Sequence, residues 1–433
     1  MRSSHTAARF AADAPDLAEI AAKADVDAVL VGTLLRAGSR IRVSAQLLEA
    51  PSGTVMCSQS SQIDLADVFE LQDSLVQQLS ESLAVPLASR EGRRRTQDVP
   101  ASAEAYELYL RANREGHYVS ASDTASWQNA RDLYLRAVEA DPTYAPAWAR
   151  PGRIYRVMAK WGHSGGADNL ARAEAALRRA LELNPELPLA HNLYAQLEID
   201  LGRPEEAMLR LLARSRAQGA DPELFAGLVQ ACRYSGLLDA SLAAHRQARR
   251  FDPVIVTGVG HTWFLLGEYE RVIDPDLQIT PATRNAALAM LGREEEAVAA
   301  LRDAEGRLQT RYRDLLASSR ALLEGDRVES LAAARRFTAA GLQDAEALYH
   351  IARVLARNGE AVEAIRALHA AVDTGFRCHR AVQRDPWLQN VRAQPGFAAL
   401  REKTERWDHA NRTMFRDSGG EAVLGLSESR EGR

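Results

Sequence analysis

Paired helical patterns separated by glycine fill the middle of the chain. Between residues 221 and 253, apolar positions with a helical period predict one helix over 222–234 and a second over 238–251, with Gly236 between them. A proline ends the second segment, because it lacks a backbone N–H and disfavours helix at the residue before it. The same Asp-Pro or Asn-Pro stop occurs at Asp141-Pro142, Asn184-Pro185, Asp221-Pro222 and Asp252-Pro253.

The glycine inside each helical pair recurs at a nearly constant interval. Six such glycines are separated by 34, 31, 25, 33 and 34 residues, and an interval near 34 residues is typical of stacked helix–turn–helix units. One unit cannot bury its apolar face alone, so its neighbours cover it and the stack forms a superhelix with a concave surface. We therefore predict a mostly α fold with about eight helical hairpins over residues 103–373. The glycines are Gly202, Gly236, Gly267, Gly292, Gly325 and Gly359.

The helical pairs resemble the tetratricopeptide repeat. In that family a bulky residue, a Leu, a small residue and an aromatic mark the first helix, and small residues mark the point where the second helix crosses it. Larger side chains do not fit there, because the helix axes are about 8–10 Å apart. The resemblance implies a right-handed superhelix that binds a peptide or protein partner in its concave groove. One matching set is Trp148, Gly152, Tyr155, Ala173, Leu177, Ala180 and Pro185.

Two units depart from this pattern. In the first, Pro151 stands where Leu is usual. In the unit around Gly267, Pro275 and Pro281 predict a second helix that is cut short.

Residues 1–88 follow a different period and predict a small α+β domain. Apolar and other residues alternate there beside β-branched residues, which indicates strands. The dipeptide Gly38-Ser39 fits a two-residue hairpin turn between the first two strands. Helical spacing occurs on both sides of this three-strand meander. The expected strands are 28–35, 41–47 and 54–60, and the expected helices are 16–24 and 65–83.

The stretch over residues 25–70 resembles the α+β domain named after the amino-terminal part of TolB. In bacteria that domain commonly precedes tetratricopeptide arrays in receptor-type serine/threonine kinases, adenylate cyclases and winged-helix regulators. Cys57 stands near the place of the family's usual Trp, and the family's first strand and helix are missing. We therefore expect an incomplete domain in a fragment of a longer regulator, with an exposed strand edge through which copies could oligomerise. The resemblance rests on Val26-Asp27-Ala28-Val29-Leu30, Ala37-Gly38-Ser39-Arg40-Ile41-Arg42-Val43, Ala45-Gln46-Leu47 and Asp67-Val68-Phe69-Glu70.

Composition divides the rest of the chain into three parts. Residues 89–102 are rich in arginine and predict a basic, solvated linker. Residues 374–415 place aromatic side chains just after proline stops, at Trp387 and Phe397, and predict a helical cap over the open face of the last hairpin. Ser, Gly and charged residues dominate 416–433, which predicts a disordered tail.

Charge and motifs argue against several classes of protein. The chain has 54 basic and 58 acidic side chains and a net charge of −4, so we do not expect it to bind nucleic acid. The three cysteines have neither disulfide nor metal spacing. Without a long apolar run or a secretory leader, we expect no membrane span and a cytoplasmic location. No phosphate-binding loop, kinase signature or Gly-x-Ser-x-Gly motif occurs, so we predict no catalytic residue, metal, cofactor or enzyme activity.

First-helix positions that face the predicted groove carry arginines and amides. These side chains could clamp an acidic peptide through bidentate hydrogen bonds, and an ordinary solvated groove is the alternative. Two functions stay open. The chain is either a non-enzymatic scaffold for a peptide or protein partner, or the sensory tail of a kinase, adenylate cyclase or winged-helix regulator whose effector domain is missing. The predicted groove residues are Arg153, Arg156, Asn192, Gln196, Gln230, Arg233, His261 and Phe264.

Overall fold

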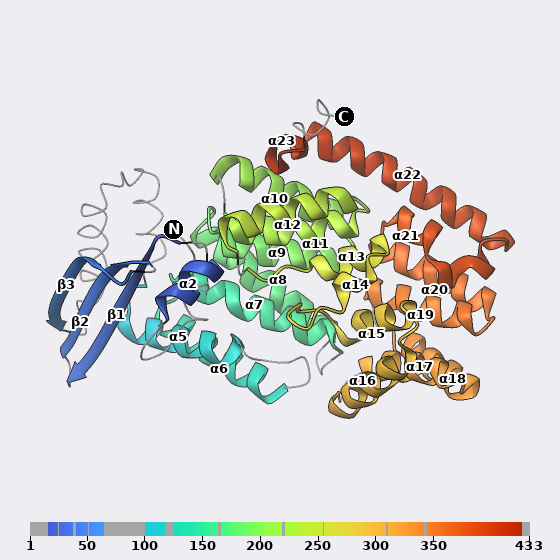
Figure 1. Cartoon of the computed structure of the whole chain (residues 1–433), viewed down its shortest axis with the longest axis horizontal. Helices are drawn as coiled ribbons and strands as arrows, with labels where there is room; N and C mark the ends of the chain where they lie inside the picture. The colour runs from blue at the N-terminus through green and yellow to red at the C-terminus, as the bar shows by residue number, and fades with distance from the viewer. Residues whose placement is uncertain are drawn as a thin grey trace.

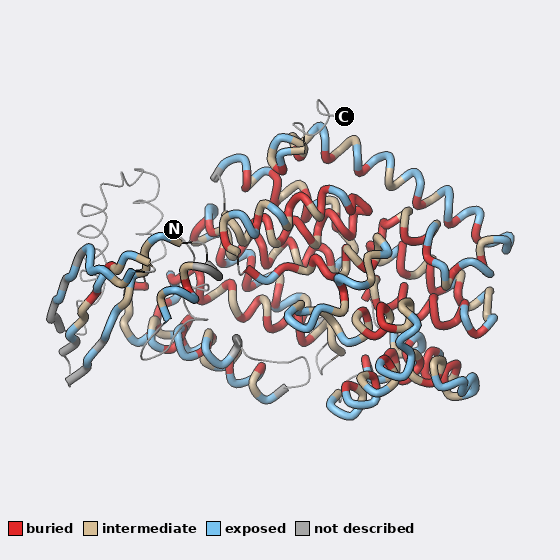
Figure 2. The backbone as a smooth tube through the Cα atoms, in the orientation of Figure 1, coloured by how far each residue is buried: buried red, intermediate tan, exposed pale blue. Residues whose placement is uncertain are grey.

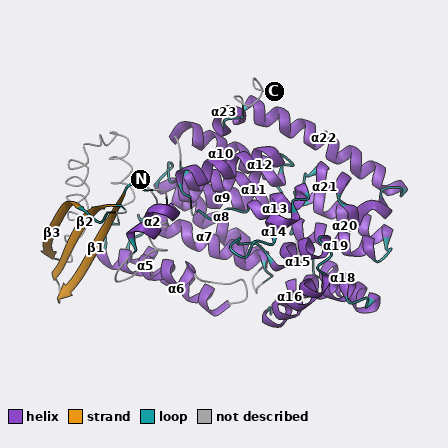
Figure 3. Ribbon diagram, in the orientation of Figure 1, coloured by secondary structure: helices purple, strands orange, loops and turns teal. Residues whose placement is uncertain are grey.

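The chain folds into paired helices with a small antiparallel sheet near its amino terminus (Figures 1 and 3). This arrangement confirms the predicted fold class, a mostly α stack of hairpins preceded by a small α+β region. The structure is a computed structural model that describes residues 16–24, 26–37, 40–50, 52–64, 100–117, 124–162, 166–218, 221–253, 255–308, 311–341 and 344–426.

Eight helical hairpins succeed one another within the described residues, from Ala103 to Asp373. The first four pairs are α5 (Ala103–His117) with α6 (Thr124–Ala140), α7 (Ala145–Lys160) with α8 (Gly166–Leu183), α9 (Pro188–Asp200) with α10 (Pro204–Gln218), and α11 (Pro222–Tyr234) with α12 (Leu238–Phe251). The last four are α13 (Val259–Leu266) with α14 (Tyr269–Val272), α15 (Pro281–Met290) with α16 (Glu294–Arg307), α17 (Tyr312–Leu323) with α18 (Arg327–Ala339), and α19 (Ala345–Arg357) with α20 (Ala361–Asp373).

The hairpins turn where the glycine pattern predicts. All six periodic glycines have φ between +75° and +85°, a left-handed conformation that glycine adopts without a Cβ clash. Asp221 caps the start of α11, where its side chain accepts hydrogen bonds from the backbone N–H groups of Glu223 at 2.8 Å and Leu224 at 3.4 Å. The predicted helices over 222–234 and 238–251 are therefore confirmed at both ends.

Small residues at the helix crossings keep the two helices of a hairpin close together. Ala173 and Ala180 of α8 are fully buried. A Cβ added to Gly152 of α7 would lie only 2.7 Å from Cγ of Leu177, so glycine is needed at this contact. Buried positions run through the interior of the whole stack (Figure 2). The repeated small residues thus set the spacing on which the stacking of hairpins depends.

The fifth hairpin is much shorter than the others. Its first helix has eight residues and its second has four, which confirms the shortening expected from the two prolines. The loop after α14 is fixed by Arg284, which donates hydrogen bonds to the carbonyl oxygens of Ile273 and Asp274 at 2.9 Å and of Leu277 at 2.6 Å. This short unit lies between the α7–α12 hairpins and the α15–α20 hairpins (Figure 1).

The carboxyl-terminal helices return to the middle of the stack. They comprise α21 (His379–Arg384), the 3-10 helix η2 (Pro386–Val391), α22 (Pro395–Asp417) and α23 (Gly420–Leu424). Before α21, the backbone N–H of Arg377 donates to the carbonyl of Tyr234 at 2.9 Å. On α22, the Asn411 side chain donates to the carbonyl of Ser235 at 2.9 Å. One apolar core consequently includes residues of α9–α12, α19, α20 and this returning segment.

The returning segment also packs against the last hairpin. Leu388, Val391 and Leu400 are fully buried, and Phe397 is nearly so. The expectation of disorder from residue 416 was wrong for 416–426, because Gly420–Leu424 form a helix and Leu424 buries its side chain in the same core. Residues 427–433 lie outside the described residues.

The amino-terminal sheet has the predicted order β1–β2–β3 and is antiparallel throughout. It comprises β1 (Ala28–Ala37), β2 (Arg40–Glu49) and β3 (Val55–Asp64), and α2 (Leu17–Ala24) precedes it. Within the described residues β1 and β3 pair only with β2, and oligomerisation through their outer edges stays a prediction. The Gly38-Ser39 turn, the helix expected over 65–83 and most of the 89–102 linker lie outside the described residues. Among the described helices, none has the length and apolar character needed to cross a bilayer.

Substituting Gly236 should destabilise the fold more than substituting Gly292. Both have positive φ, so alanine costs about 1–2 kcal/mol of conformational strain at either position. A Cβ at Gly236 would also lie 2.7 Å from the carbonyl oxygen of Arg377, whereas nothing lies within 4 Å at Gly292. In urea unfolding, G236A should therefore lose at least about 1 kcal/mol more stability than G292A. Equal losses would contradict the close approach of the returning segment.

Candidate binding site on the inner helices

The first helices of successive hairpins pack side by side, so their shared face collects polar side chains from distant parts of the chain. Contacts join α7 to α9, α9 to α11, α11 to α13 and α17 to α19. We call this shared surface the inner face. Its charged and amide side chains are Arg150, Arg153, Arg156 and Lys160 of α7, Asn192, Gln196 and Asp200 of α9, and Glu223, Gln230 and Arg233 of α11.

Four basic residues of α7 recur at helical spacing, and the last two are paired with α9. Arg156 contacts Asp200 at 2.5 Å and donates to the Gln196 amide oxygen at 2.9 Å. Lys160 shares the same carboxylate, at 3.0 Å. Burial alone would lower the pKa of Lys160, but Asp200 and Asp344 outweigh it and hold the pKa well above its usual value. Lys160 therefore stays charged inside the protein.

The acidic first turn of α19 reaches the inner face from the eighth hairpin. Asp344 is the N-cap of this helix, and its Oδ1 accepts hydrogen bonds from the backbone N–H groups of Glu346 at 3.0 Å and Ala347 at 3.1 Å. Its other oxygen, Oδ2, lies 3.4 Å from Lys160 Nζ and also accepts a hydrogen bond from the Tyr312 hydroxyl. One carboxylate thus caps its own helix and binds a cation of the second hairpin.

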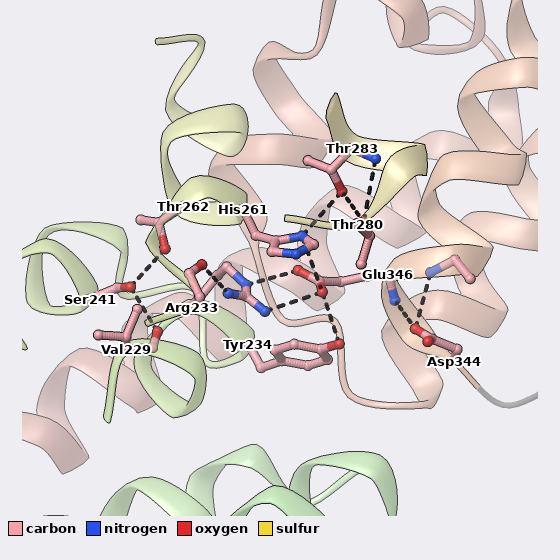
Figure 4. A network of polar contacts seen from close by, with 12 residues as sticks. Val229, Arg233, Tyr234, Ser241, His261, Thr262, Thr280, Thr283, Asp344 and Glu346 are labelled. Carbon is pink, nitrogen blue, oxygen red and sulfur yellow. Dashed lines mark hydrogen bonds and ion pairs between the residues drawn. The ribbon is translucent and has the colours of Figure 1, made fainter. Parts of the chain in front are cut away.

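Glu346 binds Arg233 through both carboxylate oxygens (Figure 4). Arg233 Nε lies 2.8 Å from Oε1, and Nη2 donates to Oε2 at 3.1 Å. The Tyr234 hydroxyl also donates to Oε2, at 3.1 Å. Arg233 is only 3% exposed, and its Nη1 donates to the carbonyl of Gly258 at 2.9 Å. Burial would raise the pKa of Glu346, but the adjacent Arg233 lowers it below the usual value.

A half-buried histidine, His261, and a buried one, His350, share one threonine beside this ion pair. Thr283 Oγ1 lies 3.1 Å from Nδ1 of His261 and 3.3 Å from Nε2 of His350. Burial lowers the pKa of His261 to about 4, and burial together with Arg353 lowers that of His350 to about 3. Both imidazoles are therefore neutral near pH 7. Glu346 lies 3.8 Å from His261, a separation that protonation would turn into an ion pair.

Arg150 and Arg153 differ from the other cations of the inner face. Among the described residues, no carboxylate lies within 4.0 Å of either guanidinium. Arg150 Nε is buried without a hydrogen bond, and the Arg153 guanidinium lies 5.6 Å from the centre of the Trp127 ring. Burial, together with Arg150 and Arg156, lowers the pKa of Arg153 to about 10. Glu223 is the nearby acid, and burial raises its pKa.

The structure brings seven of the eight predicted groove residues into one polar region. Arg156, Gln196 and Arg233 are engaged as described above. Asn192 is buried and donates to Glu223 at 3.3 Å, Gln230 is half-buried on α11, and His261 contacts Thr283. Phe264 is instead packed in the core, 4.8 Å from the Arg353 guanidinium. Peptide binding at these positions stays a prediction.

The sequence pattern missed the residues that complete this region. Arg150 and Lys160 extend the α7 row at helical spacing, so that spacing alone could have found them. Asp344 and Glu346 gave no such signal, because an N-cap aspartate followed by glutamate is ordinary at a helix start. Within the described residues, no group of three or more His, Cys, Asp or Glu side chains could hold a metal ion.

Comparisons with known sequences give one family match and one related protein. Residues 14–68 match the family described as FlgO protein, which lies in the amino-terminal α+β region, and the expected TolB-like domain is not confirmed. A protein described as putative adenylate cyclase 3 from Rhizobium meliloti (strain 1021) is 27% identical over 195 residues. This alignment covers 45% of the present chain and 32% of the relative, so the chain spans about a third of that protein's length.

Comparisons with solved structures find helical-repeat proteins at low sequence identity. The crystal structure of the APC/C hetero-tetramer Cut9–Hcn1 matches with a TM-score of 0.42 and 11% identity, over 72% of this chain and 61% of that one. The P58(IPK) TPR domain matches with a TM-score of 0.20 and 12% identity, over 70% and 98% of the two chains. Yeast Tom70 matches with a TM-score of 0.24 and 11% identity, over 76% and 97%. The fold assignment therefore rests on the hairpins themselves.

Stability should fall as the pH is lowered from 6.5 towards 5, because His261 and His350 stay neutral in the fold. Their folded pKa values lie below the unfolded value of 6.5, so the unfolded chain gains protons first and stability is lost on acidification. At pH 5.5 each histidine should cost about 1 kcal/mol. Urea unfolding at pH 7.0 and 5.5 measures this, and a double variant H261Q/H350Q should show a smaller decrease. An identical decrease in the variant would contradict the assignment.

Proposed function

We propose that the chain is a non-enzymatic protein-interaction module that binds an acidic segment of a protein partner at Arg150 and Arg153. The observation that carries this proposal is the contrast along α7. Arg156 and Lys160 have carboxylate partners from other helices, whereas the described residues supply no ion pair for Arg150 or Arg153. Both side chains are half-buried, and a partly desolvated cation is stabilised by a paired carboxylate, so an external carboxylate is the group that this part of the inner face lacks.

The surroundings of the two arginines suit a carboxylate-bearing peptide. Each guanidinium offers a planar set of N–H donors that matches a carboxylate. The Arg153 guanidinium lies over the Trp127 ring, a cation–π contact that favours one orientation of the guanidinium. Glu223 lies close enough to repel a ligand, but its raised pKa and its hydrogen bond with Asn192 reduce that repulsion. Burial, and after it repulsion from Arg150 and Arg156, lowers the pKa of Arg153, and a carboxylate of the peptide would offset that repulsion.

Replacing the two arginines should weaken binding of an acidic probe. A fluorescein-labelled decaglutamate peptide, titrated by anisotropy in 50 mM NaCl, should bind R150Q/R153Q at least about tenfold more weakly than the native chain. The control R178Q/R179Q removes two exposed arginines of α8 and should bind like the native chain. Equal affinities for both double variants would contradict a site at Arg150 and Arg153.

A second candidate is that this module regulates a bacterial signalling protein. The observation that favours it is the 195-residue similarity to a protein described as putative adenylate cyclase 3. The array would then bind its protein partner as the sensory part of a kinase, cyclase or winged-helix regulator, and the catalytic or DNA-binding work would belong to another domain. This candidate shares the binding site proposed above and adds an effector domain to it.

The purified chain should have no cyclase activity of its own. Incubated with ATP and either Mg²⁺ or Mn²⁺, it should form no more cyclic AMP than a heat-denatured sample, because the inner face lacks a cluster of carboxylates suited to metal ions among the described residues. A chromatographic assay for cyclic AMP measures this directly. Turnover that depends on the native chain would contradict the non-enzymatic proposal.

A further inference from the structure

We propose that the acidic first turn of α19 acts as an internal ligand of the inner face, occupying the cations that would otherwise bind a partner's acidic residues. This inference rests on the proposed function, because it assigns the regulation of the same surface. It concerns Asp344 and Glu346 together, whose carboxylates pair with Lys160 and Arg233, whereas among the described residues Arg150 and Arg153 have no carboxylate within 4.0 Å.

The contact joins hairpins that are remote in sequence. Glu346 follows Arg233 by 113 residues in the sequence, and its two carboxylate oxygens contact Nε and Nη2 of the Arg233 guanidinium. A second pair, Lys160 with Asp344, lies alongside it. The rings of Trp161 and Tyr312 meet beside these pairs with centroids 4.5 Å apart. The carboxylates of α19 are thus docked on α7 and α11 in the manner that an acidic peptide would use.

The charge balance shows what this docking changes. The hairpins of the inner face supply five cations, namely Arg150, Arg153, Arg156, Lys160 and Arg233, and two acids, Asp200 and Glu223. Asp344 and Glu346 raise the number of acids from two to four. The internal carboxylates therefore lower the positive charge of this surface, because four of the five cations are then balanced by acids. The remaining positive charge restricts the external ligand to the Arg150 end.

Polar contacts connect the internal ligand with that open end. Asp344 contacts Lys160, which shares Asp200 with Arg156. Arg156 also binds Gln196, whose amide lies 3.5 Å from Asn192 Oδ1, and Asn192 binds Glu223 beside the two open arginines. Releasing the α19 acids lets Lys160 compete more strongly for Asp200, and the guanidinium of Arg156 then becomes available to an external carboxylate. Along this path we expect the α19 acids to be coupled to the reactivity of Arg156, which chemical modification of Arg156 measures.

The test neutralises the internal ligand while keeping its shape. In D344N/E346Q, asparagine still caps α19, because Asn and Asp are equally good N-caps. The readout is modification of arginine by phenylglyoxal in the full chain, located by mass spectrometry. Arg156 and Arg233 should react at least fivefold faster in D344N/E346Q than in the native chain. Circular dichroism and the melting curve show that the variant is folded, and the single variant E346Q supplies the same test at Arg233 if the double variant is not.

A matched control is available on the outer surface. Glu363 of α20 binds Arg335 through both prongs, at 3.1 and 2.7 Å, as Glu346 binds Arg233, but this pair is exposed. E363Q removes an equivalent ion pair and should leave the modification rates of Arg156 and Arg233 at their native values. If E363Q raises those rates as much as the α19 variant does, general loosening explains the result and the proposal is overturned.

Binding of the decaglutamate probe separates this inference from the proposed function. D344N/E346Q should bind the probe at least fivefold more tightly than the native chain and show a steeper dependence on salt. If both arginines stay protected in D344N/E346Q, the internal ligand is refuted whatever the probe does. If they become reactive but the probe binds neither protein, the internal ligand stands, and the proposed acidic partner is the part that fails.

Discussion

No hairpin in this chain can cover its own apolar face, and this constraint shapes the whole molecule. An open stack would leave two bare ends and a long inner surface, as in a one-dimensional array whose units touch only their neighbours. Here the carboxyl-terminal segment returns to α10, α11 and α12, and the eighth hairpin meets the second and fourth. The short fifth hairpin lies between the hairpins that this return brings together.

Closure of the stack forces charged residues into its interior, where each needs a partner. Removing a guanidinium and a carboxylate from water costs several kcal/mol per ion, which their attraction offsets only when the geometry is good. Arg233 and Glu346 make two contacts with each other, of which the one from Nη2 is a hydrogen bond, and Gly258 and Tyr234 add one hydrogen bond to each partner. Arg353, which is 1% exposed, is held similarly by Asp385 at 2.6 Å and lies between the rings of Phe264 and Trp387. Such pairs fix the register of distant hairpins, since each cation accepts one placement of its carboxylate.

Local structure could be predicted from the sequence, and long-range docking could not. Glycine and proline act on their own neighbours in the chain, so Gly236 and the Asp-Pro stops located helix ends to within a residue. The shortened fifth hairpin followed from two prolines for the same reason. By contrast, Arg233 was expected to face a partner, and its contact with Glu346 depends on how the eight connections between α11 and α19 add up. Small differences in each turn accumulate over 113 residues, and no pattern of apolar positions encodes that sum.

The internal contact between the fourth and eighth hairpins has a consequence for how this protein can evolve. Open repeat proteins lengthen or shorten by duplication or loss of whole repeats, because every unit offers the same interface to its neighbour. A stack that closes on itself has a fixed circumference. An inserted or deleted repeat between Arg233 and Glu346 would misalign the two charges and leave each largely buried without its partner. Selection should therefore hold the number of repeats in this stretch constant while it tolerates changes in individual surface residues.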